Sequence, residues 1–395
     1  MKSKKVSKTN LGFTKFRKLA QRREWLALWL ACCGLAVGFS ARAYAQQNAT
    51  PLDVTGNAGI VSANSKSGAT FTTFDPAGSI GTHASGINDA GAIAGSYSDV
   101  ANVSHGFLRD SSGAITTFDA PGAGILGTVA LAINRPGQVT GYYTDAGFTR
   151  HAFLRAPSGA ITTFDAAPGA IATYGSGLDD SGAIAGLYVD ISTVSHAFLR
   201  DANGTITPFD APGAGTAFGQ GTYGVSINKS GEITGFYRDG ADVYHGFLRS
   251  PKGVITTFDA PGAGTGAGQG TRAAISINDA GAITGYYIDA SDSSHGFLRD
   301  PNGAIHAFDA PGASSAAGGT RGVGINKYGE ITGFYRDDGF MSHGFLRDSN
   351  GAIHPFDAPG AATIGTFPNS INASEAITGT YWDVSFVSHG FLRNP

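Results

Sequence analysis

A repeated string of five residues limits the fold more than any other feature of this 395-residue chain. The string reads His-(Gly/Ala)-Phe-Leu-Arg, and consecutive copies lie 45 to 50 residues apart. The seven copies begin at His105, His151, His196, His245, His295, His343 and His389. A repeat of this length predicts a row of equivalent structural units and not a set of unrelated domains.

Each repeat contains four short segments with the composition of β-strands. In the fourth repeat they are residues 225–228, 232–237, 245–249 and 254–258, rich in β-branched and aromatic residues and separated by turn-forming residues. Four strands in a unit of about 45 residues are typical of a β-propeller blade. The 59 glycines and the charged fraction of 14% argue against exposed helices. We therefore predict an all-β protein.

The two ends of the repeat array complement each other. Residues 70–74 read as a fourth strand with no first three before it, and the last copy ends after its third strand, residues 389–393. Pairing these two strands would complete seven units and close the sheet edges. The sequence therefore predicts a single domain over residues 69–395. It would be a seven-bladed β-propeller with four antiparallel strands per blade, closed by the N-terminal strand joining the last blade.

The first 45 residues differ in composition from the repeats. They hold 10 of the 27 lysines and arginines and a single acidic residue. An apolar run follows, and then the small-x-small sequence Ala43-Tyr44-Ala45. This order predicts a signal peptide over 1–45, a linker over 46–68, and a protein that is secreted or held in the periplasm or cell envelope. Arg22-Arg23 is compatible with twin-arginine export, general secretion is the other route, and an uncleaved anchor is an alternative.

Removal of this leader changes the charge balance. The whole chain has a net charge of −3, whereas residues 46–395 carry 17 basic and 29 acidic residues, a net charge of −12. Nucleic acids and anionic membranes are recognised through clustered lysine and arginine. We therefore expect no nucleic acid partner and, after leader cleavage, no membrane partner. Both cysteines, Cys32 and Cys33, lie in the leader, which leaves neither a disulfide nor a thiol nucleophile.

Length variation within the repeats is confined to one connection. Spacings from the second strand through the motif His to the Phe-Asp aspartate are constant, whereas the connection from the fourth strand to the next first strand varies. Antiparallel strands place this connection and the second-to-third turn on one face, and binding sites usually occupy loops on a rigid scaffold. Arg272 and Arg321 begin first strands beside the longest connections, so they are our candidates for binding an anionic or sugar ligand.

Pairs of polar residues recur in every repeat. They are of types found in catalytic and metal sites, but their number favours a structural role. An Asp and a His six residues apart occur in every repeat, for example Asp239 and His245. They could form a general base or a metal site, yet seven copies exceed what one active site needs, so we interpret them as structural hydrogen bonds. The Arg of Phe-Leu-Arg and the Asp of Phe-Asp could likewise form an ion pair, between the third and fourth strands or between neighbouring units, and we interpret such a pair as structural. We predict no catalytic residue, no metal and no cofactor.

The repeat resembles that of the extracellular HAF-repeat family. The family string His-Ala-Phe stands at 151–153 and 196–198, and the other five copies read His-Gly-Phe. The segment Ile-Asn-x-x-Gly-x-Ile-x-Gly at 277–285 also resembles the family repeat, although Arg follows Phe-Leu where the family often has Trp. The resemblance covers nearly all of the chain after the leader. It implies an exported, mostly bacterial repeat protein of no established activity.

Two classes of function fit these observations. The first is a binding or interaction module for an extracellular glycan or protein, which we favour because no set of nucleophile and base stands out. The alternative is a propeller hydrolase or lyase acting on an extracellular polysaccharide, for which a deep pocket with two unrepeated carboxylates would be expected. A passive structural spacer is a third reading. We expect a monomer.

Overall fold

The computed structural model describes residues 68–395, with the exception of 317 and 363. The predicted signal peptide, and the predicted linker apart from its last residue, lie outside the described residues. The described residues belong to the compact unit Ser40–Pro395. They form strands, turns and loops, and within them no helix is long and apolar enough to cross a membrane. The predicted all-β class is confirmed.

The 28 strands of the described residues follow the four positions predicted for a repeat. The first strands of repeats 1 to 7 are β2 (Gly81–Ile87), β6 (Thr128–Ile133), β10 (Ala172–Leu178), β14 (Gly221–Ile227), β18 (Gly270–Ile277), β22 (Thr320–Ile325) and β26 (Gly365–Ile371). The second strands are β3 (Ile93–Ser98), β7 (Val139–Thr144), β11 (Ile184–Val189), β15 (Ile233–Arg238), β19 (Ile283–Ile288), β23 (Ile331–Arg336) and β27 (Ile377–Trp382). The third strands are β4 (Ser104–Arg109), β8 (Arg150–Arg155), β12 (Ser195–Arg200), β16 (Tyr244–Arg249), β20 (Ser294–Arg299), β24 (Ser342–Arg347) and β28 (Ser388–Asn394). The fourth strands are β5 (Ile115–Phe118), β9 (Ile161–Phe164), β13 (Ile206–Phe209), β17 (Ile255–Phe258), β21 (Ile305–Phe308), β25 (Ile353–Phe356) and, in repeat 7, β1 (Thr70–Phe74).

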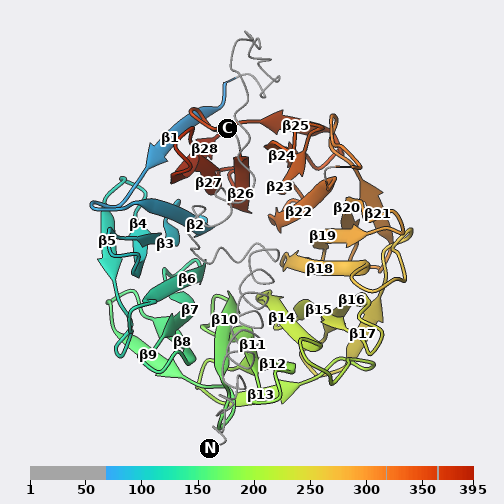
Figure 1. Cartoon of the computed structure of the whole chain (residues 1–395), viewed down its shortest axis with the longest axis horizontal. Helices are drawn as coiled ribbons and strands as arrows, with labels where there is room; N and C mark the ends of the chain where they lie inside the picture. Colours follow the sequence, from blue (N-terminus) through green and yellow to red (C-terminus); the bar gives the residue numbers. More distant parts are fainter. Residues whose placement is uncertain (1–67, 317, 363) are drawn as a thin grey trace, which may run out of the picture. The chain divides into compact units, whose positions relative to one another are not determined.

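Strands of one repeat pair antiparallel in chain order, as β14 to β17 do in repeat 4. In repeat 7, β1 pairs with β28 from Thr70 opposite Asn394 to Phe74 opposite Gly390. The four-stranded units lie side by side around a common centre, with the first strands innermost (Figure 1). β2 of repeat 1 packs against β26, β27 and β28 of repeat 7, so the two ends of the array are neighbours.

Phenylalanine side chains pack between neighbouring units. The Phe of every His-(Gly/Ala)-Phe string is fully buried. Phe247 of β16 meets Phe209 of the preceding repeat edge-on, with ring centroids 6.0 Å apart. Gly235 on β15 makes room for this ring, because a Cβ there would lie 2.8 Å from a Phe247 ring carbon. Burial of one such side chain contributes roughly 1.5–3 kcal/mol, so these contacts are a large part of what holds adjacent units together.

The Arg of each Phe-Leu-Arg string does not form the predicted ion pair with the Asp of Phe-Asp. Its guanidinium lies over the fourth-strand Phe of the preceding repeat, as Arg249 does over Phe209 at 4.8 Å from the ring centroid. The prediction is wrong because of the hairpin register. Arg249 pairs with Ile255 at the turn end of the β16–β17 hairpin, whereas Asp259 follows the opposite end of β17. Burial lowers the pKa of Arg249.

Candidate functional site

The seven units present two unlike faces, because successive antiparallel strands run in opposite directions. The turn face carries the first-to-second and third-to-fourth turns. The loop face carries the second-to-third turns, five residues long in every repeat, and the fourth-to-first loops of six to eleven residues. The second-to-third turns are 99–103, 145–149, 190–194, 239–243, 289–293, 337–341 and 383–387. The fourth-to-first loops are 75–80, 119–127, 165–171, 210–220, 259–269, 309–319 and 357–364.

On the loop face, each motif histidine is held between two aspartates, an arrangement that we call the Asp–His–Asp clamp. In repeat 6, Nδ1 of His343 lies 2.9 Å from a carboxylate oxygen of Asp357, and Nε2 lies 3.3 Å from one of Asp337. The imidazole stacks on Tyr335 with ring centroids 5.1 Å apart. Across the seven repeats the Nδ1 distances are 2.7–3.0 Å and the Nε2 distances 3.3–3.7 Å.

Although burial acts in the opposite direction, the clamp aspartates raise the pKa of the motif histidine in repeats 5, 6 and 7. The hydrogen bond to Asp357 raises the pKa of His343, and burial only partly opposes this effect. Burial raises the pKa of Tyr335 to about 12, so the stacked ring is neutral at pH 7. In repeat 7, the Val387 N–H donates to Asp383 at 2.9 Å and lowers the pKa of that carboxyl. One aspartate therefore orders both the second-to-third turn and the histidine, which is a structural role.

The Asp and the His six residues apart lie together in every repeat, but the predicted hydrogen bond between them forms in repeats 2, 5 and 6, and the shorter bond is to a second aspartate that sequence reasoning missed. In the last repeat this second partner is Asp75, which lies 2.7 Å from Nδ1 of His389 although 314 residues separate them. The constant 14-residue spacing from His to the Phe-Asp aspartate was the available signal, but that aspartate was predicted to pair with Arg. Within residues 68–395, apart from the gaps at 317 and 363, no group of three His, Cys, Asp or Glu side chains is arranged to hold a metal ion.

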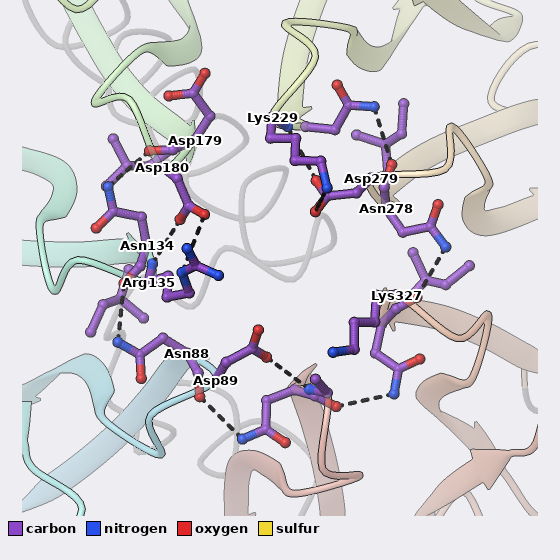
Figure 2. Close-up of a pocket in the computed structure, with 18 of the residues that line it drawn as sticks. Asn88, Asp89, Asn134, Arg135, Asp179, Asp180, Lys229, Asn278, Asp279 and Lys327 are labelled. Atoms are coloured by element: carbon purple, nitrogen blue, oxygen red, sulfur yellow. Dashed lines mark hydrogen bonds and ion pairs between the residues drawn. The ribbon is translucent and has the colours of Figure 1, made fainter.

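A polar pocket of about 250 Å³ opens at the centre of the turn face (Figure 2). It is lined by the last residue of each first strand and the two residues that follow, which begin Ile-Asn in six repeats and Leu178-Asp179 in repeat 3. Six asparagines donate from Nδ2 to the backbone carbonyl oxygen at the same position in the next repeat, over 2.8–3.1 Å. The donors are Asn88, Asn134, Asn228, Asn278, Asn326 and Asn372. Asn372 donates to the carbonyl of Asn88, so the series also links repeat 7 to repeat 1.

Asp179 interrupts this series in repeat 3. A carboxylate has no N–H donor, so it offers no equivalent bond to the carbonyl oxygen of Asn228 in repeat 4. Oδ1 of Asp179 accepts from the N–H groups of Ser181 and Ala183 at 2.9 Å, as the asparagine Oδ1 atoms do in other repeats. The side chain of Asp179 is itself buried.

Charged side chains alternate around the mouth of this pocket (Figure 2). The residues after the asparagine position are, in order, Asp89, Arg135, Asp180, Lys229, Asp279, Lys327 and Ala373. Asp279 accepts from the backbone N–H of Lys229 at 3.2 Å and lies 3.1 Å from its Nζ. Exposed pairs of this kind contribute roughly 0–1 kcal/mol. The pocket's polar groups thus serve mainly to join neighbouring repeats, on the face opposite the one where the sequence predicts binding.

Exposed apolar side chains gather on the loop face. Of the 13 large apolar side chains exposed among the described residues, 11 belong to this face. They are Ile80, Val100, Ile125, Leu126, Phe148, Ile171, Ile191, Phe218, Phe340, Val384 and Phe386. The two on the turn face are Val254 and Tyr328. No sequence pattern marked this set, because the residues share no spacing and stand alone or in pairs in segments rich in Gly, Ala, Ser and Asp.

The two candidate ligand-binding arginines lie in strands, away from the turn-face pocket. Arg272 in β18 and Arg321 in β22 are half-buried. The guanidinium of Arg321 lies 4.8 Å from the ring centroid of Tyr286, and that of Arg272 lies 5.3 Å from the centroid of Tyr244. Each therefore stacks on an aromatic ring of the preceding repeat. A ligand-binding role for them stays a prediction.

Comparison with known proteins supports the fold and no more. No family model matches the chain, and no curated protein matches it. The fold is similar to virginiamycin B lyase from Staphylococcus aureus, with 14% identity over 82% of this chain and 99% of that one and a TM-score of 0.54. Weaker likenesses, both with a TM-score of 0.40, are to TolB from Acinetobacter baumannii (13% identity, 74% of this chain and 76% of that one) and to the Aleuria aurantia lectin bound to α-methyl-L-fucoside (12% identity, 81% and 93%). The described part of the chain has a β-propeller-like fold.

Proposed function

We propose that the chain is a seven-bladed β-propeller, closed by β1 on the third strand of repeat 7, and that it acts as an exported interaction module that binds its partner on the loop face. Closure is supported by the register of β1 with β28 and by the hydrogen bond from Asn372 to the carbonyl of Asn88. The composition of the leader supports export. An exported protein acts in the cell envelope or in the surrounding medium.

The segregation of exposed apolar side chains carries this proposal. Eleven of 13 lie on one face, and that face also contains the connections that vary in length. Scattered apolar residues on a surface need no explanation, but a gathering on one face is typical of an interaction site. The turn face, in contrast, is made of short turns whose polar groups are used in bonds between repeats.

Binding is favoured over catalysis by the disposition of the acid–base groups. The motif histidines of the loop face all belong to clamps, and a clamp occurs in each repeat. An active site needs one such set, with geometry that differs from its copies. The hydrolase or lyase alternative therefore has no specific observation in its favour.

The test compares the two faces on the chain from residue 46 onward. One variant carries Val100→Ser, Ile191→Ser and Val384→Ser on the loop face, and the control carries Val254→Ser and Tyr328→Ser on the turn face. Both are screened with the parent chain against a glycan array and against cell-envelope fractions. We expect binding to be lost in the first variant and kept in the control. Binding that survives the loop-face changes, or no binding to any fraction, contradicts the proposal.

A further inference from the structure

The second-to-third turns share one unusual backbone position. Their fourth residue adopts a left-handed conformation in every repeat, with φ between 59° and 66°. The residues at this position are Asn102, Phe148, Thr193, Asp242, Asp292, Phe340 and Phe386. Asn and Asp tolerate this conformation well, because their short polar side chains bond locally. A bulky aromatic residue there is a true outlier.

Three phenylalanines occupy this position, where a short polar residue would suit the backbone better. Phe148, Phe340 and Phe386 are 54%, 64% and 46% exposed, so much of each ring stays in water. Each position therefore combines backbone strain with an exposed apolar surface, although Asn102 shows that the same turn forms with a favoured residue. Strain kept at an exposed position indicates a role outside the folded chain.

Other turn tips extend this feature to five consecutive repeats. The second turn residue is 80% exposed in Val100, 83% in Ile191 and 77% in Val384. Repeats 6, 7, 1, 2 and 3 thus each present at least one exposed large apolar side chain on a second-to-third turn, and these repeats are consecutive around the centre (Figure 1). Repeats 4 and 5 carry only small or acidic residues there, at 239–242 and 289–292. We call the five-repeat set the apolar arc.

The geometry of the arc suits a flat partner. All seven second-to-third turns have the same length, and units related by rotation about one centre place equivalent residues at the same height. We therefore expect the tips of the arc to lie close to one plane. A small ligand would contact one or two of these tips, whereas a planar surface can contact all of them at once.

The charge of the loop face limits the chemistry of that surface. Its turns and loops contain no lysine and no arginine, and the arginines at the adjoining strand ends, Arg150, Arg238 and Arg336, are half-buried. Beyond the clamp aspartates, the turns carry Asp242, Asp292 and Asp338, of which Asp242 pairs with Arg238 over 3.2 Å. An anionic surface is repelled by such a face, and binding to it normally requires lysine or arginine. Aliphatic and phenylalanine side chains favour an uncharged interface between polar headgroups and acyl chains.

We propose that the apolar arc inserts into the surface of a bilayer of zwitterionic lipids, so that the protein is a peripheral membrane binder. This inference rests on the proposed use of the loop face and names its partner. The sequence-based expectation of no membrane partner depended on the acidic net charge, and that reasoning applies to anionic lipids and not to exposed apolar turns.

The experiment measures co-sedimentation of the chain from residue 46 onward with phosphatidylcholine vesicles. The test variant carries F148N, F340N and F386N, which remove the rings and place a residue that suits the left-handed turn. Loss of three inserted rings should weaken binding on the order of 100-fold or more. Thermal unfolding reports the fold independently, and we expect its midpoint to stay or rise because Asn relieves the strain. The reverse change, N102F, should strengthen vesicle binding.

Further comparisons separate the possible partners. Phosphatidylglycerol added to the vesicles should weaken binding, because the clamp and turn aspartates repel it. Equal binding by the triple variant and the parent chain, or no binding of the parent chain, overturns the lipid inference. If sedimentation shows a parent dimer that the triple variant abolishes, the arc covers a second copy and the inference is also wrong. If the parent chain binds a glycan or a protein but no vesicles, and the triple variant loses that binding, the lipid inference is wrong. The proposed function of the loop face as an interaction module is then retained.

Discussion

Replacing Asp179 with asparagine should complete the series of hydrogen bonds between repeats and stabilise the fold. The six existing links join each asparagine Nδ2 to the next carbonyl over 2.8–3.1 Å, and only the link from repeat 3 to repeat 4 is missing among the seven junctions. The new amide keeps the acceptor used by Ser181 and Ala183, because Asn372 makes the same contacts with Ser374 and Ala376. The change therefore adds a donor without removing a contact.

The expected gain follows from one added hydrogen bond. A neutral intramolecular hydrogen bond contributes about 1 kcal/mol net. Unfolding entropy of roughly 2 cal/mol/K per residue, over roughly 330 residues, converts this gain into a rise in Tm of about 1–2 °C. The reverse change, Asn278→Asp, leaves the Asn326 carbonyl without its donor and should destabilise by about 1–3 kcal/mol.

Differential scanning calorimetry at pH 7 measures both variants against the parent chain. The matched pair matters because each change alters net charge by one unit in opposite directions at equivalent positions. A lower Tm for Asp179→Asn, or shifts of the same sign in both variants, would refute the idea that the missing donor limits stability at this junction.

Three further predictions concern the packing of the units and the clamps. Because the pKa of His343 is raised, its clamp stabilises fully below its unfolded pKa of about 6.5, and this contribution is lost as pH rises through the folded value. Asp383 has a lowered pKa, so its contribution is lost as pH falls through the folded value, below about 3.8. The Tm should therefore fall on both sides when it is followed from pH 3 to 9, and His343→Gln should make the alkaline fall smaller, while the raised pKa values of His295 and His389 keep part of it. Arg249→Met removes the stacking on Phe209 and should lower the free energy of unfolding in urea by about 1 kcal/mol, whereas an unchanged midpoint would mean that the stack is neutral. Gly235→Ala brings a Cβ against the backbone carbonyl oxygen of Tyr223 and the Phe247 ring and should cost about 1–3 kcal/mol or more, while Gly240→Ala, where space is open, should cost far less by the same urea assay.

Strand positions were predictable from local composition except where buried polar residues begin a strand. The predicted segments 245–249 and 254–258 differ from β16 and β17 by one residue. The first strand was predicted to begin at 225, but β14 begins at Gly221. The sequence Gly-Thr resembles a loop, yet Thr222 is fully buried and pairs with Tyr237, and its hydroxyl accepts from the Ala211 N–H. The long connections are therefore shorter than they seem from the sequence.

Sequence reasoning found the elements of the candidate site and missed their partners. It named the loop face and the Asp–His pair, but it assigned the Phe-Asp aspartate to Arg, because a spacing does not reveal which end of a hairpin two side chains share. The exposure of Phe148, Phe340 and Phe386 could not be predicted either. Their neighbours in sequence are ordinary turn residues, and exposure depends on what the adjacent repeats leave uncovered.

The sequence by itself determined the repeat, the four strands in each unit, the all-β class and the complementary ends, because these depend on residue types at short and constant spacings. Only the tertiary structure decided which side chains meet. Arg249 lies over a ring of the preceding repeat, Asn372 donates to Asn88, and His389 binds Asp75 across 314 residues. Such contacts join residues that are distant along the chain, and they arise only when the units pack side by side and bring equivalent edges together.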